Sequence, residues 1–508
     1  MTYQQCVSRF RHTPTADGPF TTGVLINGQW ADTQNDKTLI VRNPITEEAI
    51  GRVPAGTALE ADRAVDAAAR TMPGWAQLPA ARRVGMVANA GKLLQAREQD
   101  FVQLASTEWG ALPSVVLESV QQCHALLRDL CKRAVGTAWQ EFDGRRAVVR
   151  EPAGVVGVIT PCEQPLTEVV GTVSAALLSG CTVVLKPSTL TPLTAFLVAE
   201  LFQQAGLPPG VLNVVPGLGH VVGAALAAHP RIDLLAFSGS REIAAQVVRL
   251  TADNGKGLVL RGGSGTAVVL LDEARMAAAV DFAVDDCLRR WSKGASAPGR
   301  LLVPRRALEQ AEELAWRRLR DRSTAQEPAA ALPPLATRGQ QVASLDLVES
   351  AVREGARAIV GGPPSPITQR GYFVPLTVLS GVDEAMAVAG YEKAGPILCV
   401  MGHDGPAHAV ALADAAPHGG PRDVWASDDQ AALIAAGHLH TDVVRVNGAP
   451  TYLDGVGPLP DSPFDLAAFC RVKAIDFSTT HRARSAVGHP AYLSEHPATP
   501  TTNGRSHP

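Results

Sequence analysis

Short apolar runs alternate with helical stretches between residues 153 and 271. The runs are AGVVGVITP, TVVLKPS, VLNVVPG, LLAFSGS, GLVLRGG and TAVVLL. Helical periods of about ten to fifteen residues separate such runs in βαβ units, and continuous apolar strands are typical of a parallel sheet that is covered on both faces. The pattern therefore predicts a doubly wound α/β domain, with one of its helices beginning at Thr191-Pro192.

The flanking regions extend this pattern in both directions. Residues 58–142 are mostly Ala-rich and amphipathic, which predicts helices that pack on the first domain. Residues 272–443 repeat the alternation, with the strand-like runs ARAIVGG and VVRVN and helical stretches between them. The sequence thus predicts a second α/β domain.

Two strand-like segments stand apart from both domains. DGRRAVVREP (143–152) alternates charged and apolar residues, and RVKAIDF (471–477) is a matching late strand. Isolated strands usually pair with a partner outside their own domain, because an unpaired edge is exposed. The residues from Ser478 onward are rich in His, Pro, Thr and Ser, so we expect a disordered tail over 478–508.

The composition of the 508 residues excludes several classes of protein. The chain has 46% hydrophobic and 19% charged residues and a formal net charge of -3, so it carries no basic footprint for nucleic acid. Its first twenty residues lack the apolar core of a signal peptide, and its apolar runs are too short to span a bilayer, so we expect a cytoplasmic protein without a membrane partner. The eight cysteines show no CxxC pair or His cluster. We therefore expect neither a disulfide framework nor a metal site, and interpret most cysteines as small buried apolar residues.

Several motifs follow one another along the chain in a specific order and spacing: INGQW (26–30), EPAGVVGVITP (151–161), VVLKPS (183–188), AGLPPGVLNVVPG (205–217), FSGS (237–240), RGYFVPLTV (370–378), EKAGP (392–396) and VN (446–447). By these motifs the chain resembles the aldehyde dehydrogenase superfamily from about Leu25 to about Phe477. This resemblance implies an α/β aldehyde dehydrogenase-like fold with two doubly wound domains and a small β oligomerisation element. The implied boundaries are 20–142 and 152–260 for the dinucleotide-binding-type domain, 261–445 for the catalytic-type domain, and 143–151 and 446–477 for the oligomerisation strands and closing segment.

A nicotinamide dinucleotide is the cofactor that this resemblance implies. Ligands of open α/β sheets bind beyond the carboxyl ends of strands, where helix N-termini offer N–H groups to phosphates. By resemblance, Lys186 holds the adenosine ribose, Ser240 meets the pyrophosphate and Glu392 holds the nicotinamide ribose; Ser188, Thr189 and Gly239 complete the predicted cofactor-binding set.

Two further features bear on this cofactor site. GLGHVVG (217–223) has the spacing GxGxxxG, which we interpret as a turn and helix start, since a lone glycine pattern is a weak signal. Thr189 stands where NAD-preferring relatives often have a glutamate that grips the ribose hydroxyls. We therefore predict that NADP, if either nucleotide binds, binds at least as well as NAD.

The family's catalytic positions carry different residues in this sequence. Aldehyde oxidation in the family uses a thiolate nucleophile, an amide that stabilises the oxyanion and a carboxylate base. The cysteine loop GQxCxAxxR is matched by residues 292–300 and places Ala295 at the nucleophile position. The ELGG motif is LRGG, with Leu260 at the base position, and the PWNFP motif is PCEQP, with Glu163 at the oxyanion position. An ionised carboxylate repels developing negative charge.

Other departures alter the predicted pocket. EKAGP carries Ala394 where the family commonly has a phenylalanine, and the residues after VN lack a glycine-rich FGG segment. Substitute nucleophiles in the active-site motifs are Ser292, Ser296 and Cys162, and a hydroxyl among them needs a base such as Glu163. We interpret Cys162 as a small apolar residue in place of the family's tryptophan, in preference to a nucleophile.

Two hypotheses remain from the sequence. The first is an aldehyde dehydrogenase-family protein that has lost the standard thiol-dependent oxidation and acts as an NAD(P)-binding homologue with a binding or partner role, or in a different reaction. The second is an active NAD(P)-dependent aldehyde dehydrogenase with an unorthodox nucleophile. In either case the resemblance implies a homodimer or homotetramer, and a small-molecule ligand.

Overall fold

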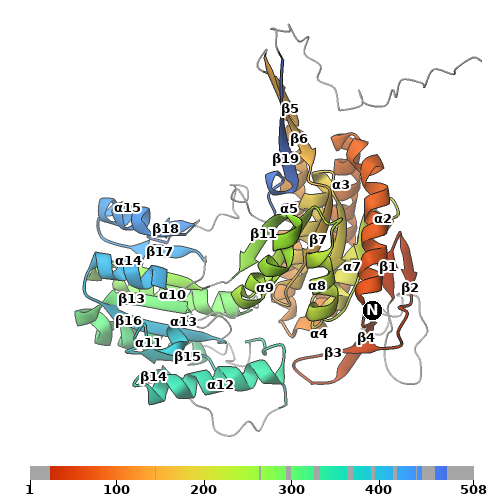
Figure 1. Ribbon diagram of the computed structural model, residues 1–508. Coiled ribbons are helices and arrows are strands. Elements are labelled where there is room, and N and C mark those ends of the chain that lie inside the picture. Colours follow the sequence, from red (N-terminus) through yellow and green to blue (C-terminus); the bar gives the residue numbers. More distant parts are fainter. Residues whose placement is uncertain are drawn as a thin grey trace, which may run out of the picture.

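The computed structural model describes residues 23–142, 145–262, 265–292, 299–324, 332–362, 370–390, 395–415, 420–441, 443–448 and 464–477. Its strands form two seven-stranded sheets, a three-stranded sheet and a two-stranded sheet. Figure 1 shows the two large sheets in separate α/β domains, with the three-stranded sheet projecting from the first. The doubly wound α/β fold that the sequence predicts is confirmed.

The first large sheet has a parallel centre and an antiparallel margin. Its strands lie in the order β11 (Gly257–Gly262), β10 (Leu234–Gly239), β7 (Val155–Ile159), β8 (Thr182–Lys186), β9 (Leu212–Val214), β1 (Val24–Ile26) and β2 (Gln29–Ala31). All neighbours from β11 to β9 are parallel, whereas β1 is antiparallel to both β9 and β2. The β1–β2 turn uses Asn27 and Gly28 at positive φ (52° and 76°), as a tight two-residue hairpin requires.

Helices cover both faces of this sheet. One apolar core contains side chains of α3 (Ala80–Ala96), α4 (Glu98–Trp109), α5 (Pro113–Gly136), α6 (Pro165–Leu178) and α7 (Pro192–Gln204). The core on the opposite face contains side chains of α2 (Ala58–Gln77), α8 (Ala224–Ala228) and α9 (Arg241–Thr251). Burial on both faces explains why the strands are continuous apolar runs.

Local sequence fixes several helix starts in this domain. The Oγ1 of Thr57 accepts a hydrogen bond from Leu59 N at 3.2 Å, and a carboxylate oxygen of Glu60 accepts from Thr57 N at 2.9 Å, which forms a capping box at the start of α2. The predicted helix at Thr191-Pro192 is confirmed as α7, with Pro192 as its first residue. The helices predicted over 58–142 end at Gly136, and Gln140–Phe142 form the strand β5 instead.

The second large sheet is parallel apart from one margin. Its order is β14 (Arg357–Val360), β15 (Thr377–Ser380), β16 (Ile397–His403), β13 (Gly299–Pro304), β12 (Thr266–Leu270), β17 (Arg422–Trp425) and β18 (Val444–Val446), with only β14–β15 antiparallel. Although the apolar alternation runs unbroken from 153 to 271, its last strand, β12, lies in this sheet and not in the first.

Helices also cover both faces of the second sheet. One core contains side chains of α10 (Met276–Ser292) and α11 (Leu308–Thr324). The other contains side chains of α12 (Arg338–Arg353), α13 (Ala387–Gly390), α14 (Pro406–Ala415) and α15 (Asp429–His438). The remaining helical turns are single ones: η1 (Gly219–Gly223), η2 (Ala252–Asn254), η3 (Glu273–Arg275), η4 (Arg305–Ala307) and η7 (Ala467–Phe469).

The two small sheets involve segments outside these layers. β3 (Thr38–Arg42) and β4 (Ala49–Pro54) form an antiparallel pair. The three-stranded sheet has the order β19 (Cys470–Asp476), β6 (Arg146–Pro152), β5 (Gln140–Phe142), all antiparallel. Within the two segments that the sequence analysis singled out, residues 146–151 pair with residues 471–476 and project from the first domain (Figure 1).

Candidate functional site

Four of the sequence motifs meet at one edge of the first sheet. Because β7, β8, β10 and β11 are parallel, their carboxyl ends lie along the same edge; the register aligns Ile159 with Lys186, and Gly239 with Gly262. PCEQP follows β7, VVLKPS ends β8, FSGS ends β10 and LRGG ends β11. This edge is where an open α/β sheet binds its ligand.

Lys186 is buried at this edge without a carboxylate partner among the described residues. Its side chain is 5% exposed, and its Nζ donates a hydrogen bond to the carbonyl of Pro187 at 2.9 Å. Burial lowers the pKa of Lys186 to about 8. An ammonium group has three donors, so this lysine can still donate to a ligand hydroxyl, as the predicted ribose contact requires.

Ser188 and Thr189 lie in the loop that leaves β8, Gly239 is the last residue of β10, and Ser240 follows it. The Oγ of Ser188 accepts from Leu190 N at 3.2 Å, and Thr189 is half-buried beside it. Ser240 is the N-cap of α9 and accepts from Ile243 N at 3.5 Å, the long limit of a hydrogen bond. A helix N-terminus and a buried lysine at the same sheet edge fit an anionic ligand, so the residues present are compatible with a nucleotide.

The segment GLGHVVG also contributes to this edge, which the sequence did not reveal. The predicted turn and helix start is confirmed, since η1 leads directly into α8. A Cβ at Gly223 would lie 3.8 Å from the Cδ of Lys186, so the segment packs along the stem of that lysine. The glycine spacing was the available signal, but it did not say which side chain the glycines approach.

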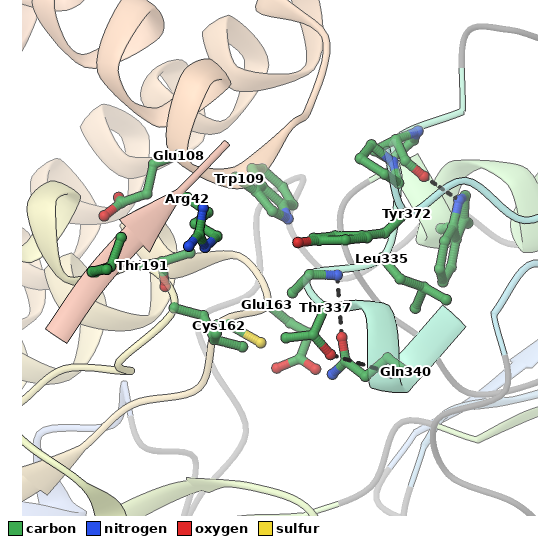
Figure 2. A pocket seen from close by; sticks show the side chains of 16 residues that line it. Arg42, Glu108, Trp109, Cys162, Glu163, Thr191, Leu335, Thr337, Gln340 and Tyr372 are labelled. Carbon is green, nitrogen blue, oxygen red and sulfur yellow. Dashed lines mark hydrogen bonds between the residues drawn. The ribbon is translucent and has the colours of Figure 1, made fainter. Parts of the chain in front are cut away.

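Cys162 and Glu163 line a cavity of about 120 Å³ between the two domains. Figure 2 shows them on the loop after β7, facing Trp109, Tyr372 and Gln340. Gln164 ends this loop in the left-handed region (φ 46°) and caps α6. Glu163 has no hydrogen bond or ion pair to any described residue and is half-buried. The structure therefore brings together two of the sequence candidates, a thiol and a carboxylate.

A buried glutamate that the sequence analysis missed lies on the same cavity. Glu108 of α4 accepts from the backbone N–H groups of Leu193 (2.5 Å) and Thr194 (2.9 Å) and from the hydroxyl of Thr194 (2.5 Å), and so caps α7 from a distant helix. Burial outweighs these hydrogen bonds and raises the pKa of Glu108 to about 7. The neighbouring Thr191 is 3% exposed, and its Oγ1 has no partner among the described residues.

Leu260 lies on β11 opposite Phe237 and is 41% exposed. The next residue, Arg261, donates from Nη1 to the Oε1 of Glu168 at 2.8 Å. A hydrocarbon side chain thus occupies the place where the family resemblance predicts a base, with an ion pair directly beside it.

The remaining candidates lie at or beyond the described ranges. Ala295, Ser296, Glu392 and Ala394 are outside the described residues, and Ser292 is the last residue of α10. Of the described cysteines, Cys123, Cys131, Cys181, Cys287 and Cys399 are buried, as predicted for small apolar residues. Among the described residues there is no group of three or more His, Cys, Asp or Glu side chains that could hold a metal ion. In that same part of the chain, no helix has the length and apolarity to cross a membrane.

Comparison with known proteins identifies the family. Residues 30–458 match the Aldehyde dehydrogenase family. The chain belongs to the aldehyde dehydrogenase family. It is 34% identical over 431 residues to a 3-succinoylsemialdehyde-pyridine dehydrogenase of Pseudomonas sp, covering 84% of this chain and 90% of that protein. It is also 32% identical over 443 residues to a chloroplastic aminoaldehyde dehydrogenase of Arabidopsis thaliana, covering 84% and 88%.

Solved aldehyde dehydrogenase structures have the same fold. Aldehyde dehydrogenase C of Pseudomonas syringae superposes with a TM-score of 0.82 at 32% identity, covering 89% of this chain and 96% of that one; it was solved as a cysteine-to-alanine variant with NAD+ and octanal. An aldehyde dehydrogenase of Mycobacterium tuberculosis, solved with NAD+, gives 0.81 at 29% identity, covering 91% and 99%. The predicted superfamily and fold are confirmed, and both neighbours bind an NAD-type cofactor.

The raised pKa of Glu108 predicts a pH-dependent stability of this aldehyde dehydrogenase-family protein. The folded state holds a proton on Glu108 between the ordinary value of 4.5 and about 7, where the unfolded state has lost it. Protonation of Glu108 therefore contributes to the free energy of unfolding in full below about pH 4.5. That contribution, up to about 3 kcal/mol, is lost as the pH rises to 7. Urea unfolding at a series of pH values measures the slope of the unfolding free energy against pH. Glu108→Gln should remove the part of that slope that lies between pH 4.5 and 7. The exposed Glu242→Gln should keep the wild-type slope, and a wild-type slope in Glu108→Gln would contradict the assignment.

Proposed function

We propose that this aldehyde dehydrogenase-family protein binds a nicotinamide dinucleotide and a small ligand but lacks the thiol-dependent aldehyde oxidation of the family. The observation that carries the proposal is the replacement of three cooperating groups: Ala295 at the nucleophile position, Leu260 at the base position and Glu163 at the oxyanion position. A binding or partner role, or a different reaction, then remains for the scaffold.

The chemistry of the replacements supports this proposal. A methyl group at Ala295 cannot attack a carbonyl, and the Leu260 side chain accepts no proton from water. Glu163 offers an acceptor where the tetrahedral intermediate needs a donor, and no described residue neutralises its carboxylate. Since the three roles belong to one reaction, their joint replacement favours lost chemistry over three independent substitutions.

Binding can persist without the chemistry. The cysteine-to-alanine variant of aldehyde dehydrogenase C holds both NAD+ and octanal, so an alanine in place of a cysteine is compatible with both ligands on that scaffold. In the present chain, Lys186 and Ser188 would hold the adenosine ribose side of the nucleotide, and Gly239 and Ser240 would receive the pyrophosphate at the N-terminus of α9. When bound, an oxidised nicotinamide ring supplies a hydride acceptor. Glu392, by resemblance, would hold the nicotinamide ribose.

A second candidate is an active dehydrogenase with a displaced nucleophile. It is favoured by one observation, the presence of Cys162 and Glu163 on the same cavity (Figure 2). By the sequence hypothesis Glu163 would be the base for a hydroxyl nucleophile, whereas its negative charge disfavours a thiolate at Cys162. Ser296 is the alternative nucleophile that the sequence offers.

We expect no aldehyde-dependent cofactor reduction by the wild-type protein above background, because no thiohemiacetal forms without the thiol. The measurement is absorbance of the reduced cofactor against a panel of aldehydes. Ala295→Cys alone should turn over poorly, since loss of one oxyanion donor costs about a hundredfold to a thousandfold in rate. The triple change Ala295→Cys, Leu260→Glu, Glu163→Asn should give detectable activity, because groups that act as a unit are strongly non-additive.

Substitution of the alternative nucleophiles separates the two candidates. Robust turnover by the wild-type protein that is abolished by Cys162→Ala or Ser296→Ala would contradict the proposal and establish the displaced nucleophile. Cys123→Ala is the matched control, because that thiol is buried away from the cavity and burial raises its pKa to about 12.

We expect NADP to bind at least as well as NAD. Thr189 carries no charge that would repel a 2′-phosphate, and the nearby Lys186 is a cation below its pKa of about 8. Calorimetric titration of the two nucleotides measures the ratio, and Lys186→Ala should abolish binding of both. The control Lys256→Ala removes another lysine with a pKa lowered to about 8, whose Nζ donates to His229 O. Clearly tighter binding of NAD would contradict this expectation.

We also propose a homodimer or homotetramer built on the three-stranded sheet. β19 pairs with β6 on one side only among the described strands, and every residue from Arg471 to Asp476 is exposed. Val472 is 69% exposed and Ile475 is 41% exposed, so the edge offers both unpaired backbone groups and apolar side chains to a second copy.

Light scattering at micromolar concentration tests this assembly. The wild-type protein should have at least the mass of a dimer, and the double variant Val472→Lys, Ile475→Lys should shift toward the monomer because its edge then carries like charges. Val342→Lys, on the surface of α12, should leave the mass unchanged. A monomeric wild-type protein would rule the assembly out.

A further inference from the structure

Arg261, Glu168 and Phe464 form a cluster beside Leu260, separate from the residues that line the cavity of Figure 2. The Nη1 of Arg261 donates to Glu168 Oε1 at 2.8 Å, and its guanidinium carbon lies 5.4 Å from the centroid of the Phe464 ring. The three residues come from β11, α6 and the segment before β19, so only the tertiary fold brings them together. We call them the Arg261 cluster.

The strand period places Arg261 toward α6. Successive side chains of a strand point to opposite faces, so Arg261 shares a face with Val259. Val259 is 7% exposed and belongs to the same apolar core as Val169 and Val170 of α6. Arg261 follows at the end of this apolar row, where the sheet edge opens, and its side chain is 50% exposed.

Glu168 fixes one side of the guanidinium. Its carboxylate is on the first turns of α6 and is 7% exposed; Oε1 accepts from Arg261, and Oε2 is buried without a hydrogen-bond partner among the described residues. Such burial costs free energy unless the carboxylate is paired. Glu168 is therefore a positioning residue that limits the orientations of Arg261.

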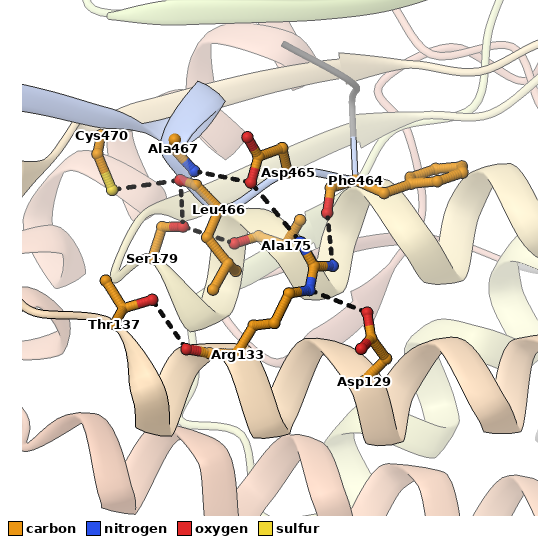
Figure 3. A network of polar contacts seen from close by, with 10 residues as sticks. All are labelled: Asp129, Arg133, Thr137, Ala175, Ser179, Phe464, Asp465, Leu466, Ala467 and Cys470. Atoms are coloured by element: carbon orange, nitrogen blue, oxygen red, sulfur yellow. Dashed lines mark hydrogen bonds and ion pairs between the residues drawn. The ribbon is translucent and has the colours of Figure 1, made fainter. Parts of the chain in front are cut away.

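Phe464 fixes the other side. Figure 3 shows Arg133 donating to the carbonyl of Phe464, while Arg133 also pairs with Asp129 and Asp465; the phenyl ring points away from this polar network. A Cβ at Gly171 would lie 2.5 Å from that ring, so the ring packs directly on α6. The cation–π contact with this ring and the hydrogen bond to Glu168 together limit the orientations of the Arg261 guanidinium.

We propose that Arg261 binds the carboxylate group of a small carbonyl compound. A planar, half-exposed guanidinium matches a carboxylate in shape and donor spacing. The pair with Glu168 carries no net charge, so an anion would be bound through the remaining N–H groups of Arg261, and the Glu168 charge repels a phosphate dianion more than a carboxylate monoanion. The proposal rests on the proposed function and deepens it, because it names a chemical class for the small ligand and places the ligand's carboxylate at the Arg261 cluster, beside Leu260 and outside the cavity of Figure 2.

The test compares succinic semialdehyde with butanal, which has the same chain length and no carboxylate. Calorimetric titration of the full chain should give a dissociation constant about tenfold to a hundredfold lower for succinic semialdehyde, the range expected for one charge-assisted hydrogen-bonded pair. Arg261→Gln should abolish this preference and leave the butanal affinity unchanged, and Arg261→Lys should restore part of it. Inorganic phosphate should compete weakly.

The exposed Arg249→Gln on α9 is the matched control and should keep the wild-type preference. Equal affinities for the two aldehydes in the wild-type protein, or a preference that survives Arg261→Gln, would overturn the inference. If Arg261→Gln does not fold, the salt dependence of the wild-type protein provides the test. A preference for succinic semialdehyde over butanal that does not shrink with added salt would also overturn the inference. Absorbance of the reduced cofactor, measured after NAD is added to the same samples, tests the proposed function separately. Turnover would contradict the proposed loss of aldehyde oxidation, whether or not the protein prefers the carboxylate-bearing aldehyde.

Discussion

The parallel ladder of β7, β8, β10 and β11 is the constraint on which the rest of the candidate site depends. Helices cover both faces of this sheet, so the middles of its strands are apolar and the polar side chains lie near the strand ends. Parallel strands end at a common edge, and four loops with unrelated sequence positions therefore meet there. Lys186, Ser240, Glu163 and Arg261 lie along one sheet edge because of that ladder and not because of their own interactions.

At this edge the chain keeps the architecture of an aldehyde dehydrogenase and changes its charges. The residues predicted to hold the nucleotide retain the necessary chemistry: a buried amine at Lys186 and a capped helix N-terminus at Ser240. The positions predicted for catalysis differ, with hydrocarbon at Leu260 and a carboxylate at Glu163. An ion pair between Arg261 and Glu168 stands one residue from Leu260. The residues proposed for nucleotide binding and the positions predicted for catalysis are different residues, so one set can change while the other stays.

Buried charge also shapes the second domain near the end of α10. Arg445 of β18 pairs with Asp423 of β17 at 2.5 Å, and Arg300 of β13 donates to the carbonyls of Leu412 and Ala413. Burial lowers the pKa of Arg300 to about 10 and raises that of Asp423. Since a buried charge is costly without its partner, these strands are tied to each other by pairs that do not tolerate loss of one member.

The sequence by itself determined the elements, the fold and the chemical types of the candidate residues. Apolar runs and helical periods are local, so β7, β8 and α7 could be predicted from 153–204 alone, and the motif order identified the family resemblance. The alternation did not show that β12 leaves the first sheet, because a strand's sheet depends on its pairing partners. Nor did it predict the strand β5, which is short and fully exposed.

Contacts between distant segments were decided only by the tertiary structure. The cap that Glu108 places on α7 joins residues 85 positions apart, and the bond between Arg261 and Glu168 joins residues 93 positions apart. No local pattern encodes either, because a buried glutamate and an exposed one look alike in sequence. What distinguishes them is the desolvation and the hydrogen-bond donors that packing supplies.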